Sequence, residues 1–249
     1  MVARPILGAA ALILLAGGLL LQWFLILSGG VNSSPENQFY FLQASTNGIA
    51  GARNPSRWTF WAICGVDGSG HNANCGSPVP ALPFDPPRNF GTQNNIPGSF
   101  IGTHKYYYLS RFMFAWYLIA FFFAHIALFT GLLALFSRLG GYLSALTTFV
   151  AMFFQALGAA LMTAWVVQGR NAWRSNGFDA HVGTKLMAFA WTSFVCYFLA
   201  SLLFCIGGTI GRESSGSSRM SRKRSTRSTR SRGSFLDTES QRRVKDNYS

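Results

Sequence analysis

Four long apolar runs without a formal charge constrain this 249-residue chain more than any other feature. They cover residues 5–27, 112–136, 142–167 and 186–210. Each reaches the length of about 20 residues at which a helix crosses a bilayer, and lipid favours helices because it offers backbone groups no partner. The alternative is a soluble protein that buries all four runs as helices. Four charge-free helices of this length are not expected in so short a soluble chain, so the pattern favours a membrane protein. We therefore predict a mainly α-helical membrane protein built on a bundle of four transmembrane helices.

The first run must also be distinguished from a cleaved signal peptide. Arg4 supplies a thin basic segment before it, and the small residues Ser28 and Gly29 follow it. The apolar core of a signal peptide has only about 7–15 residues, whereas residues 5–27 form a longer uninterrupted stretch. The length favours a retained transmembrane helix.

The charge of the chain is segregated, and the segregation predicts an orientation. Charged residues make up only 12% of the sequence, yet the formal net charge is +13. Basic residues favour the cytoplasmic side, and an even number of spans places both ends on one side. We therefore predict both termini in the cytoplasm, in agreement with Arg4 and Arg138. Residues 28–111 then form a loop on the outer side of the membrane. A loop of this length is translocated largely regardless of its charge. The basic residues within 168–185, in the second outer loop, weigh against this orientation.

Two features inside the spans are candidates for function. Ala156, Ala160 and Ala164 repeat at four-residue spacing, and such small residues let helices approach closely, either within the bundle or between copies of the chain. His125 lies near the middle of the second span, where an ionisable group is a functional candidate. Because the spans hold no second charged or histidine residue, an imidazole bonded to a neighbouring helix is the simpler interpretation.

The outer loop is long enough for a small folded unit. Phe39–Ala44 and Trp58–Ile63 are rich in aromatic and aliphatic residues, as strands are, and Asn47-Gly48 between them is a turn signal. Residues 76–97 contain six prolines, which predicts an extended, irregular segment. We expect a small β-containing layer outside the membrane.

Two of the four cysteines, Cys64 and Cys75, lie in this loop with ten residues between them. On the predicted topology they face the oxidising side of the membrane, where a disulfide forms and persists. Metal binding is the alternative because His71 lies between them, but three ligands without a fourth make a poor zinc site. We predict a disulfide that staples the loop, and no metal site.

Two further residues, Cys205 and Asn32, carry modification hypotheses. Cys196 and Cys205 lie in the last span, and Cys205, near its cytoplasmic end, is a candidate for palmitoylation, with a plain buried cysteine as the alternative. Asn32 begins a glycosylation sequon close to the end of the first span and therefore close to the bilayer.

An aromatic segment and a Trp/Cys element resemble the first outer loop of the fungal Sur/PalI-type family, four-span plasma-membrane proteins associated with eisosomes. The Trp-x-x-Cys…Cys element is also similar to the outer-loop signature of claudins. The residues that carry the resemblance are Phe39–Thr46, Arg57–Gly65 with Trp58, Trp61 and Gly65, and Cys75, and the likeness continues through Pro83–Pro87 and Tyr106–Leu135. One departure is Ala44-Ser45-Thr46, where the family pattern has an acidic residue.

The resemblance implies a claudin-like bundle under a small β-layer, and residence in static, furrow-like compartments of the plasma membrane. It also implies family roles in membrane organisation, endocytosis and cell-wall integrity, and in one branch in ambient-pH signalling.

Residues 211–249 form a basic tail after the membrane unit of residues 1–210, with a net charge of +7 and almost nothing apolar to bury, which predicts disorder. Basic clusters beside a transmembrane helix bind anionic lipids such as phosphoinositides, and phosphorylation of Ser225 would weaken that attraction. An RNA-binding tract and a solvated anchor without a specific partner are the alternatives, and membrane tethering disfavours nucleic acid. The candidate lipid-binding residues are Arg219, Arg222, Lys223, Arg224, Arg227, Arg230 and Arg232.

The leading functional prediction is a non-catalytic organiser of the plasma membrane that forms homo-oligomers or co-assembles with other proteins of its compartment. A sensor or signalling subunit in the ambient-pH response is the alternative. Its chemistry would come from the four histidines, His71, His104, His125 and His181. The sequence shows no Ser/His/Asp set, no paired acids, no phosphate loop and no acidic residue in a span. We predict neither enzymatic activity nor a cofactor, and a transporter is the least favoured class.

Overall fold

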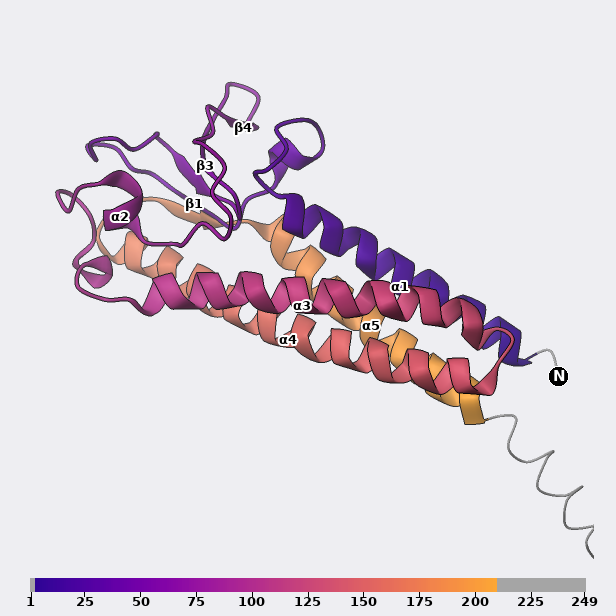
Figure 1. The fold of residues 1–249 in the computed structure, drawn as a ribbon. Coiled ribbons are helices and arrows are strands. Elements are labelled where there is room, and N and C mark those ends of the chain that lie inside the picture. Colours follow the sequence, from indigo (N-terminus) through magenta and orange to yellow (C-terminus); the bar gives the residue numbers. More distant parts are fainter. Residues whose placement is uncertain (1–2, 210–249) are drawn as a thin grey trace, which may run out of the picture. The chain divides into compact units, whose positions relative to one another are not determined.

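The computed structural model describes residues 3–209, with side chains from residue 5 onward, and it shows four long helices with a small sheet at one end (Figure 1). The helices are α1 (Ala3–Leu27), α3 (Lys105–Ala134), α4 (Arg138–Ser175) and α5 (Thr184–Thr209). Each is long and apolar enough to cross a membrane. The predicted fold class, a four-helix membrane bundle with a disulfide-stapled β-containing loop, is confirmed.

Small residues face the inside of the bundle and large apolar residues face outward. In α3, Ala120, Ala124 and Ala127 are fully buried, whereas Phe122 and Phe129 are 61% and 67% exposed. A soluble helix would bury its phenylalanines, because water penalises their exposure. Lipid does not penalise exposed phenylalanines. Helix pairs in membranes are therefore stabilised mainly by the close approach of their backbones, which small residues allow. The distribution is that of a helix surrounded by hydrocarbon.

Buried polar side chains join the helices across the bundle. The Gln22 amide of α1 donates to the carbonyl of Tyr117 in α3 at 3.0 Å and accepts from the hydroxyl of Tyr197 in α5 at 2.5 Å. Gln155 of α4 donates to the carbonyl of Ala190 in α5 at 3.0 Å. Such bonds between helices fix their relative positions in a medium that offers no competing water.

The hairpin of α3 and α4 packs closely. Ser137 caps α4, where its hydroxyl accepts from the N–H of Gly140 at 3.2 Å. Gly158, deeper in α4, faces the ring of Tyr117, and a Cβ there would lie only 2.9 Å from two of its carbon atoms. Glycine at this position lets an aromatic ring of α3 lie directly against the backbone of α4.

The helices extend beyond the predicted apolar spans on the side of the sheet. α3 begins at Lys105, before residue 112, and α4 continues past residue 167 to Ser175. The additional turns bring Tyr106 and Trp173 among the side chains of the sheet and its connecting loops, which we call the outer layer after the predicted orientation. Residues 168–185, between the third and fourth predicted spans, are thus helical at both ends.

The sheet has five short antiparallel strands in the order β4-β3-β2-β1-β5. The strands are β1 (Leu42–Ala44), β2 (Ser56–Trp58), β3 (Ile63–Val66), β4 (Asn72–Ala73) and β5 (Ala180–Val182). Leu42 pairs with Trp58 on one side and with Val182 on the other. The last strand comes from the segment between α4 and α5, so both outer segments form a single sheet.

Two expectations for the loop need correction. Trp58–Ile63 is not one strand, because the Thr59 hydroxyl donates to the carbonyl of Ala62 at 2.6 Å and accepts from its N–H at 3.1 Å, and the chain turns there. The proline-rich segment is not wholly irregular either. It contains α2 (Pro86–Phe90), which ends at Gly91 in the left-handed conformation with φ 68°. Two 3-10 turns, η1 (Glu36–Gln38) and η2 (Gly98–Phe100), complete the layer.

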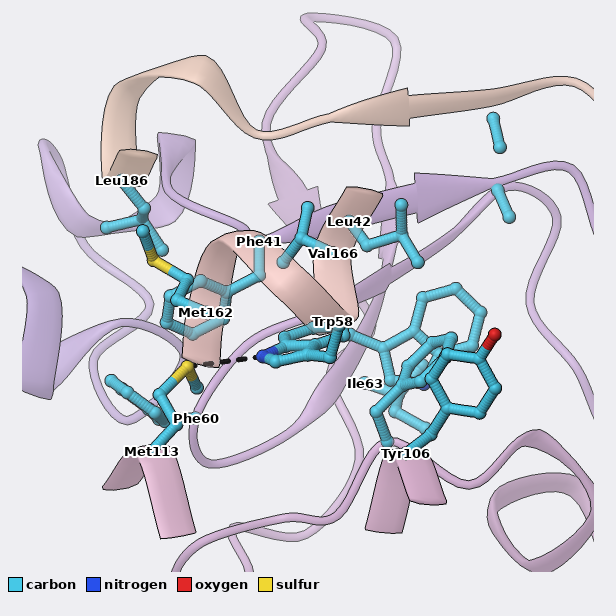
Figure 2. Close-up of a cluster of buried hydrophobic side chains, with 14 of the residues drawn as sticks. Phe41, Leu42, Trp58, Phe60, Ile63, Tyr106, Met113, Met162, Val166 and Leu186 are labelled. Carbon is cyan, nitrogen blue, oxygen red and sulfur yellow. Dashed lines mark hydrogen bonds between the residues drawn. The ribbon is translucent and has the colours of Figure 1, made fainter. Parts of the chain in front are cut away.

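One hydrophobic core runs from the sheet into the bundle (Figure 2). Phe41, Trp58 and Phe60 of the outer layer lie with Met113 of α3 and Met162 of α4 in this cluster. The indole of Trp165 donates to the sulfur of Met113 at 3.2 Å. The outer layer is therefore packed onto the helices and is not a separate domain.

Candidate functional site

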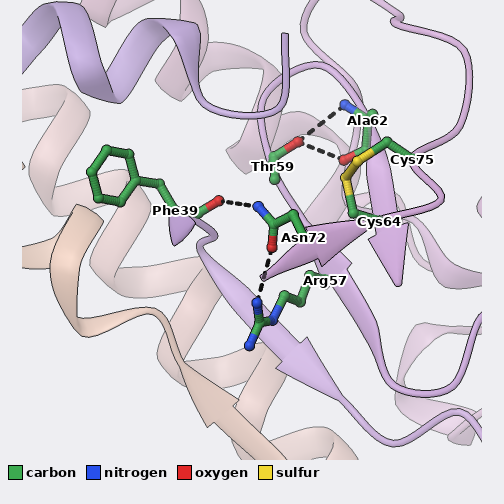
Figure 3. The surroundings of a disulfide bond; sticks show 7 residues. All are labelled: Phe39, Arg57, Thr59, Ala62, Cys64, Asn72 and Cys75. Atoms are coloured by element: carbon green, nitrogen blue, oxygen red, sulfur yellow. Dashed lines mark hydrogen bonds between the residues drawn. A yellow bond between two sulfur atoms is a disulfide. The ribbon is translucent and has the colours of Figure 1, made fainter. Parts of the chain in front are cut away.

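The outer layer is stapled by a disulfide between Cys64 of β3 and Cys75 after β4 (Figure 3). The N–H of Gly76 donates to the carbonyl of Ile63 at 3.0 Å, so the backbone beside the staple is also paired. The predicted disulfide is confirmed. Both sulfurs are used in it, which removes them as metal ligands with His71.

Removing this staple is expected to weaken the outer layer. The double variant Cys64→Ser/Cys75→Ser should lower the free energy of unfolding by about 2–3 kcal/mol, because the open loop has more conformations in the unfolded chain. Denaturant titration of the full chain in detergent micelles, followed by tryptophan fluorescence, measures the change. Cys196→Ser/Cys205→Ser is the matched control, because both cysteines are free. Equal stability of the two double variants would contradict the prediction.

Trp58 lies at the centre of the contact between sheet and bundle. Its side chain is only 2% exposed. Its ring lies 5.1 Å from that of Phe84 and 6.0 Å from that of Trp173 in α4, and its Nε1 donates to Asn89 Oδ1 at 3.0 Å. Trp58 thereby joins β2, the proline-rich segment and the membrane bundle.

The other two motif residues hold the layer in different ways. Trp61 donates from Nε1 to the carbonyl of Ile26 at 2.7 Å, in the last turn of α1. Gly65 lies in β3, where a Cβ would be 3.4 Å from the carbonyl oxygen of Ala73. Trp58 and Trp61 thus make structural contacts, and a Cβ at Gly65 would meet only an ordinary van der Waals contact.

Arg57, which the sequence indicated only as the first residue of the Arg57–Gly65 segment, is the centre of a buried polar network in the sheet (Figure 3). Its Nε donates to Gln43 Oε1 at 2.7 Å, and its Nη1 donates to the Gly70 carbonyl at 2.9 Å and to Asn72 Oδ1 at 3.1 Å. The guanidinium also lies 4.2 Å from the ring centre of Tyr40. Burial lowers the pKa of Arg57, but a guanidinium stays charged in proteins.

The network continues toward the membrane and into the β3–β4 turn. Asn72 donates from Nδ2 to the carbonyl of Phe39 at 2.8 Å. The Asp67 carboxylate accepts from the N–H groups of His71 at 2.8 Å and Ser69 at 2.9 Å. These bonds, that from His71 above all, lower the pKa of Asp67, so it stays ionised.

Glu36 in η1 is a second residue that sequence reasoning missed. Its side chain is 5% exposed, and both carboxylate oxygens are buried without a hydrogen-bond partner. Burial raises the pKa of Glu36 from its ordinary 4.5 to about 7. The sequence held no signal for this, because Glu36 stands among polar loop residues after α1. Its burial depends on the folded layer.

The residues predicted inside the spans lie apart from the outer layer. Nδ1 of His125 lies 2.9 Å from the Phe121 carbonyl of its own helix, and its ring lies 5.9 Å from that of Trp23 in α1. The expected bond to a neighbouring helix is therefore wrong. Cys205 is exposed and Cys196 partly buried on α5, and Asn32 is exposed just after α1.

The alanine stripe of α4 points mainly away from the bundle. Ala160 is exposed, and Ala156 and Ala164 are only partly buried. The bundle buries Gly158 and Ala159 instead. The candidate tail residues fall outside the described residues: Arg219, Arg222, Lys223, Arg224, Ser225, Arg227, Arg230 and Arg232.

Residues 7–203 match the SUR7/PalI family. The chain is 43% identical over 182 residues to SUR7 family protein FMP45 of Saccharomyces cerevisiae and 39% identical over 198 residues to Protein SUR7 of Candida albicans. It is 35% identical over 185 residues to an uncharacterized plasma membrane protein of Saccharomyces cerevisiae. These matches cover 72%, 79% and 73% of this chain, and 59%, 72% and 62% of those proteins. The chain thus spans only part of the length of the relatives that it matches.

Proposed function

Because this chain belongs to the SUR7/PalI family of membrane proteins, we propose that it is a non-catalytic organiser of the plasma membrane. In this role it holds neighbouring membrane proteins in static compartments of the eisosome type, which in turn support endocytosis and cell-wall integrity. A relative described as a plasma membrane protein supports the location.

The observation that carries this proposal is the outward stripe on α4. Ala160 lies exposed between two partly buried alanines, on a surface that the helices of the same chain do not cover. Small residues at four-residue spacing let a second helix approach closely in lipid. We infer that a second copy of the chain, or another protein of the compartment, packs against this stripe.

The orientation and the tail belong to the same proposal. With both termini in the cytoplasm, the stapled sheet lies outside the cell and the basic tail faces anionic lipids, phosphoinositides among them. Phosphorylation of Ser225 would then release the tail, and palmitoylation of Cys205 would strengthen the anchor.

The stripe allows a direct test in the native membrane. Ala160→Leu should cause the tagged chain to leave stable patches, because a bulky residue in a close helix contact costs about 1–3 kcal/mol, or roughly 5- to 150-fold in association. Fluorescence recovery and single-molecule counting at endogenous level measure the change. Ala115→Leu, on an exposed position of α3, is the matched control. A wild-type chain that diffuses freely as a monomer would overturn the proposal.

A second candidate function, an ambient-pH sensor, is favoured by Glu36. A buried carboxyl group on the outer side, with a pKa raised to about 7, changes its charge near neutral pH. A strain carrying Glu36→Gln that keeps its patches and loses its alkaline response would favour the sensor.

A further inference from the structure

A cavity of about 310 Å³ lies between the β3–β4 turn and the start of α5. Its lining includes Arg57, His71 and Lys185, and contains neither Asp nor Glu among the described residues. We propose that this cavity binds a phosphate group, and that the phosphate is that of a lipid headgroup.

Arg57 supplies a fixed cationic donor at the inner wall of the cavity. Its Nε and Nη1 are held by the sheet network, and its Nη2 has no hydrogen-bond partner among the described residues. The buried guanidinium is therefore held in place, with one amino group left for a ligand. Its planar fork suits phosphate, and its fixed position lowers the entropy lost on binding.

The first turn of α5 supplies further donors. The backbone N–H groups of Thr184, Lys185 and Leu186 meet no side-chain acceptor, and this turn has no acidic residue. The N-terminus of a helix attracts anions through such N–H groups and the helix dipole. Gly183, directly before this turn, also lines the cavity. Of the first turn, Thr184 and Lys185 line the cavity, so donors border it from both the sheet and the helix.

No carboxylate lines the cavity among the described residues, although the charge of Asp67 in the β3–β4 turn attracts the guanidinium of Arg57. Asp67 is exposed, and its carboxylate already accepts two backbone N–H groups of its own turn. Lys185 donates from Nζ to Gln38 Oε1 at 2.6 Å, which holds its ammonium beside the cavity. Two permanent cations therefore line a space that no acidic side chain enters.

The surroundings favour a lipid over free phosphate. Lys185 begins an outward face of α5 that continues through Ala188, Thr192, Val195 and Leu199, all exposed. In a membrane this face contacts acyl chains. A phosphate held at Lys185 therefore lies at the level of the headgroups, with its lipid chains along the face below.

Photolabelling of the full chain in detergent micelles tests the site. The probe is phosphatidic acid with a photoreactive group in its acyl chain, and the labelled peptides are mapped by mass spectrometry, which separates the cavity from the tail. Lys185→Ala should reduce labelling of residues 186–199 about tenfold, as expected for one charge-assisted hydrogen bond. Lys105→Ala is the matched control. It removes an exposed lysine that begins another span but does not line the cavity.

Competition identifies the source of the phosphate. Displacement of the probe by unlabelled phosphatidic acid but not by inorganic phosphate supports a lipid ligand, and displacement by inorganic phosphate supports the same site with a soluble ligand. Unchanged labelling in Lys185→Ala would overturn the proposal, and so would equal labelling by a neutral diacylglycerol probe.

Discussion

Replacing Trp58 by alanine is expected to lower the free energy of unfolding by about 3–5 kcal/mol, the usual effect of removing a large buried aromatic side chain. The ring is almost completely buried and touches Phe84, Phe90 and Trp173. Alanine would leave a cavity between the sheet and α4, and Asn89 would lose the indole donor. Denaturant titration of the full chain in micelles measures the loss.

Two further variants separate packing from other effects. Trp58→Phe keeps most of the ring and loses the bond to Asn89, so it should cost about 1 kcal/mol for the hydrogen bond plus a smaller cavity. Trp191→Ala removes a tryptophan that is 41% exposed on α5 and should cost far less than Trp58→Ala. Similar losses for Trp58→Ala and Trp191→Ala would refute the assigned role of Trp58 as the contact between layer and bundle.

The four helices and the disulfide could be predicted from the sequence because strong local constraints determine them. An apolar run without charge is satisfied as a helix in lipid, and this holds whatever the rest of the chain does. Cys64 and Cys75 are close in sequence, so a disulfide between them requires only a turn. Neither prediction needed knowledge of distant contacts.

The sheet could be predicted only in part. β1 falls within the expected Phe39–Ala44 segment, but a turn divides the second expected strand, because the Thr59 hydroxyl bonds the backbone of Ala62 there. β5 has only three residues and pairs with β1 from a distant part of the sequence. Such short strands are stabilised by their partner and carry no periodic signal of their own. α2, by contrast, was detectable from prolines at its start and glycine at its end.

The two most unusual side chains of the layer, Arg57 and Glu36, could not be recognised in advance. Charged residues in a loop are normally solvated, and their burial depends on which segments cover them. Arg57 is covered by β1, β4 and the β3–β4 turn, and η1 places Glu36 inside the layer. The burial of Arg57 and Glu36 therefore depends on the folded layer, and the amino-acid composition of the loop does not reveal it.

Basic residues of the outer layer also gather at a second cavity, of about 420 Å³, whose lining includes Arg53, Arg88 and Arg111. Arg88 and Arg111 lie 4.7 Å and 5.4 Å from the ring centre of Tyr107. Part of the positive charge of this layer is thus held by aromatic faces, which stabilise cations in partly buried positions.

Glu36→Gln is expected to make the outer layer more stable above pH 7, by on the order of 3 kcal/mol, from the difference between the ordinary pKa of 4.5 and the folded value of about 7. The folded state binds the proton of Glu36 more tightly than the unfolded state does. The wild-type unfolding free energy should therefore be highest below pH 4.5, fall as the pH rises to about 7, and then level off. Glutamine cannot ionise, so this fall should disappear.

Denaturant titrations at a series of pH values between 4.5 and 8 test whether the unfolding free energy falls as the pH rises. Asp67→Asn is the matched control, because the pKa of Asp67 is lowered and its carboxylate stays ionised over this range, so the fall should persist in that variant. A wild-type profile without a fall, or the same fall in Glu36→Gln, would show that Glu36 is solvated in the folded protein. A fall that Glu36→Gln removes would mean that ionisation of a single carboxyl group weakens the outer layer near neutral pH. That is the property that a pH-sensing role requires.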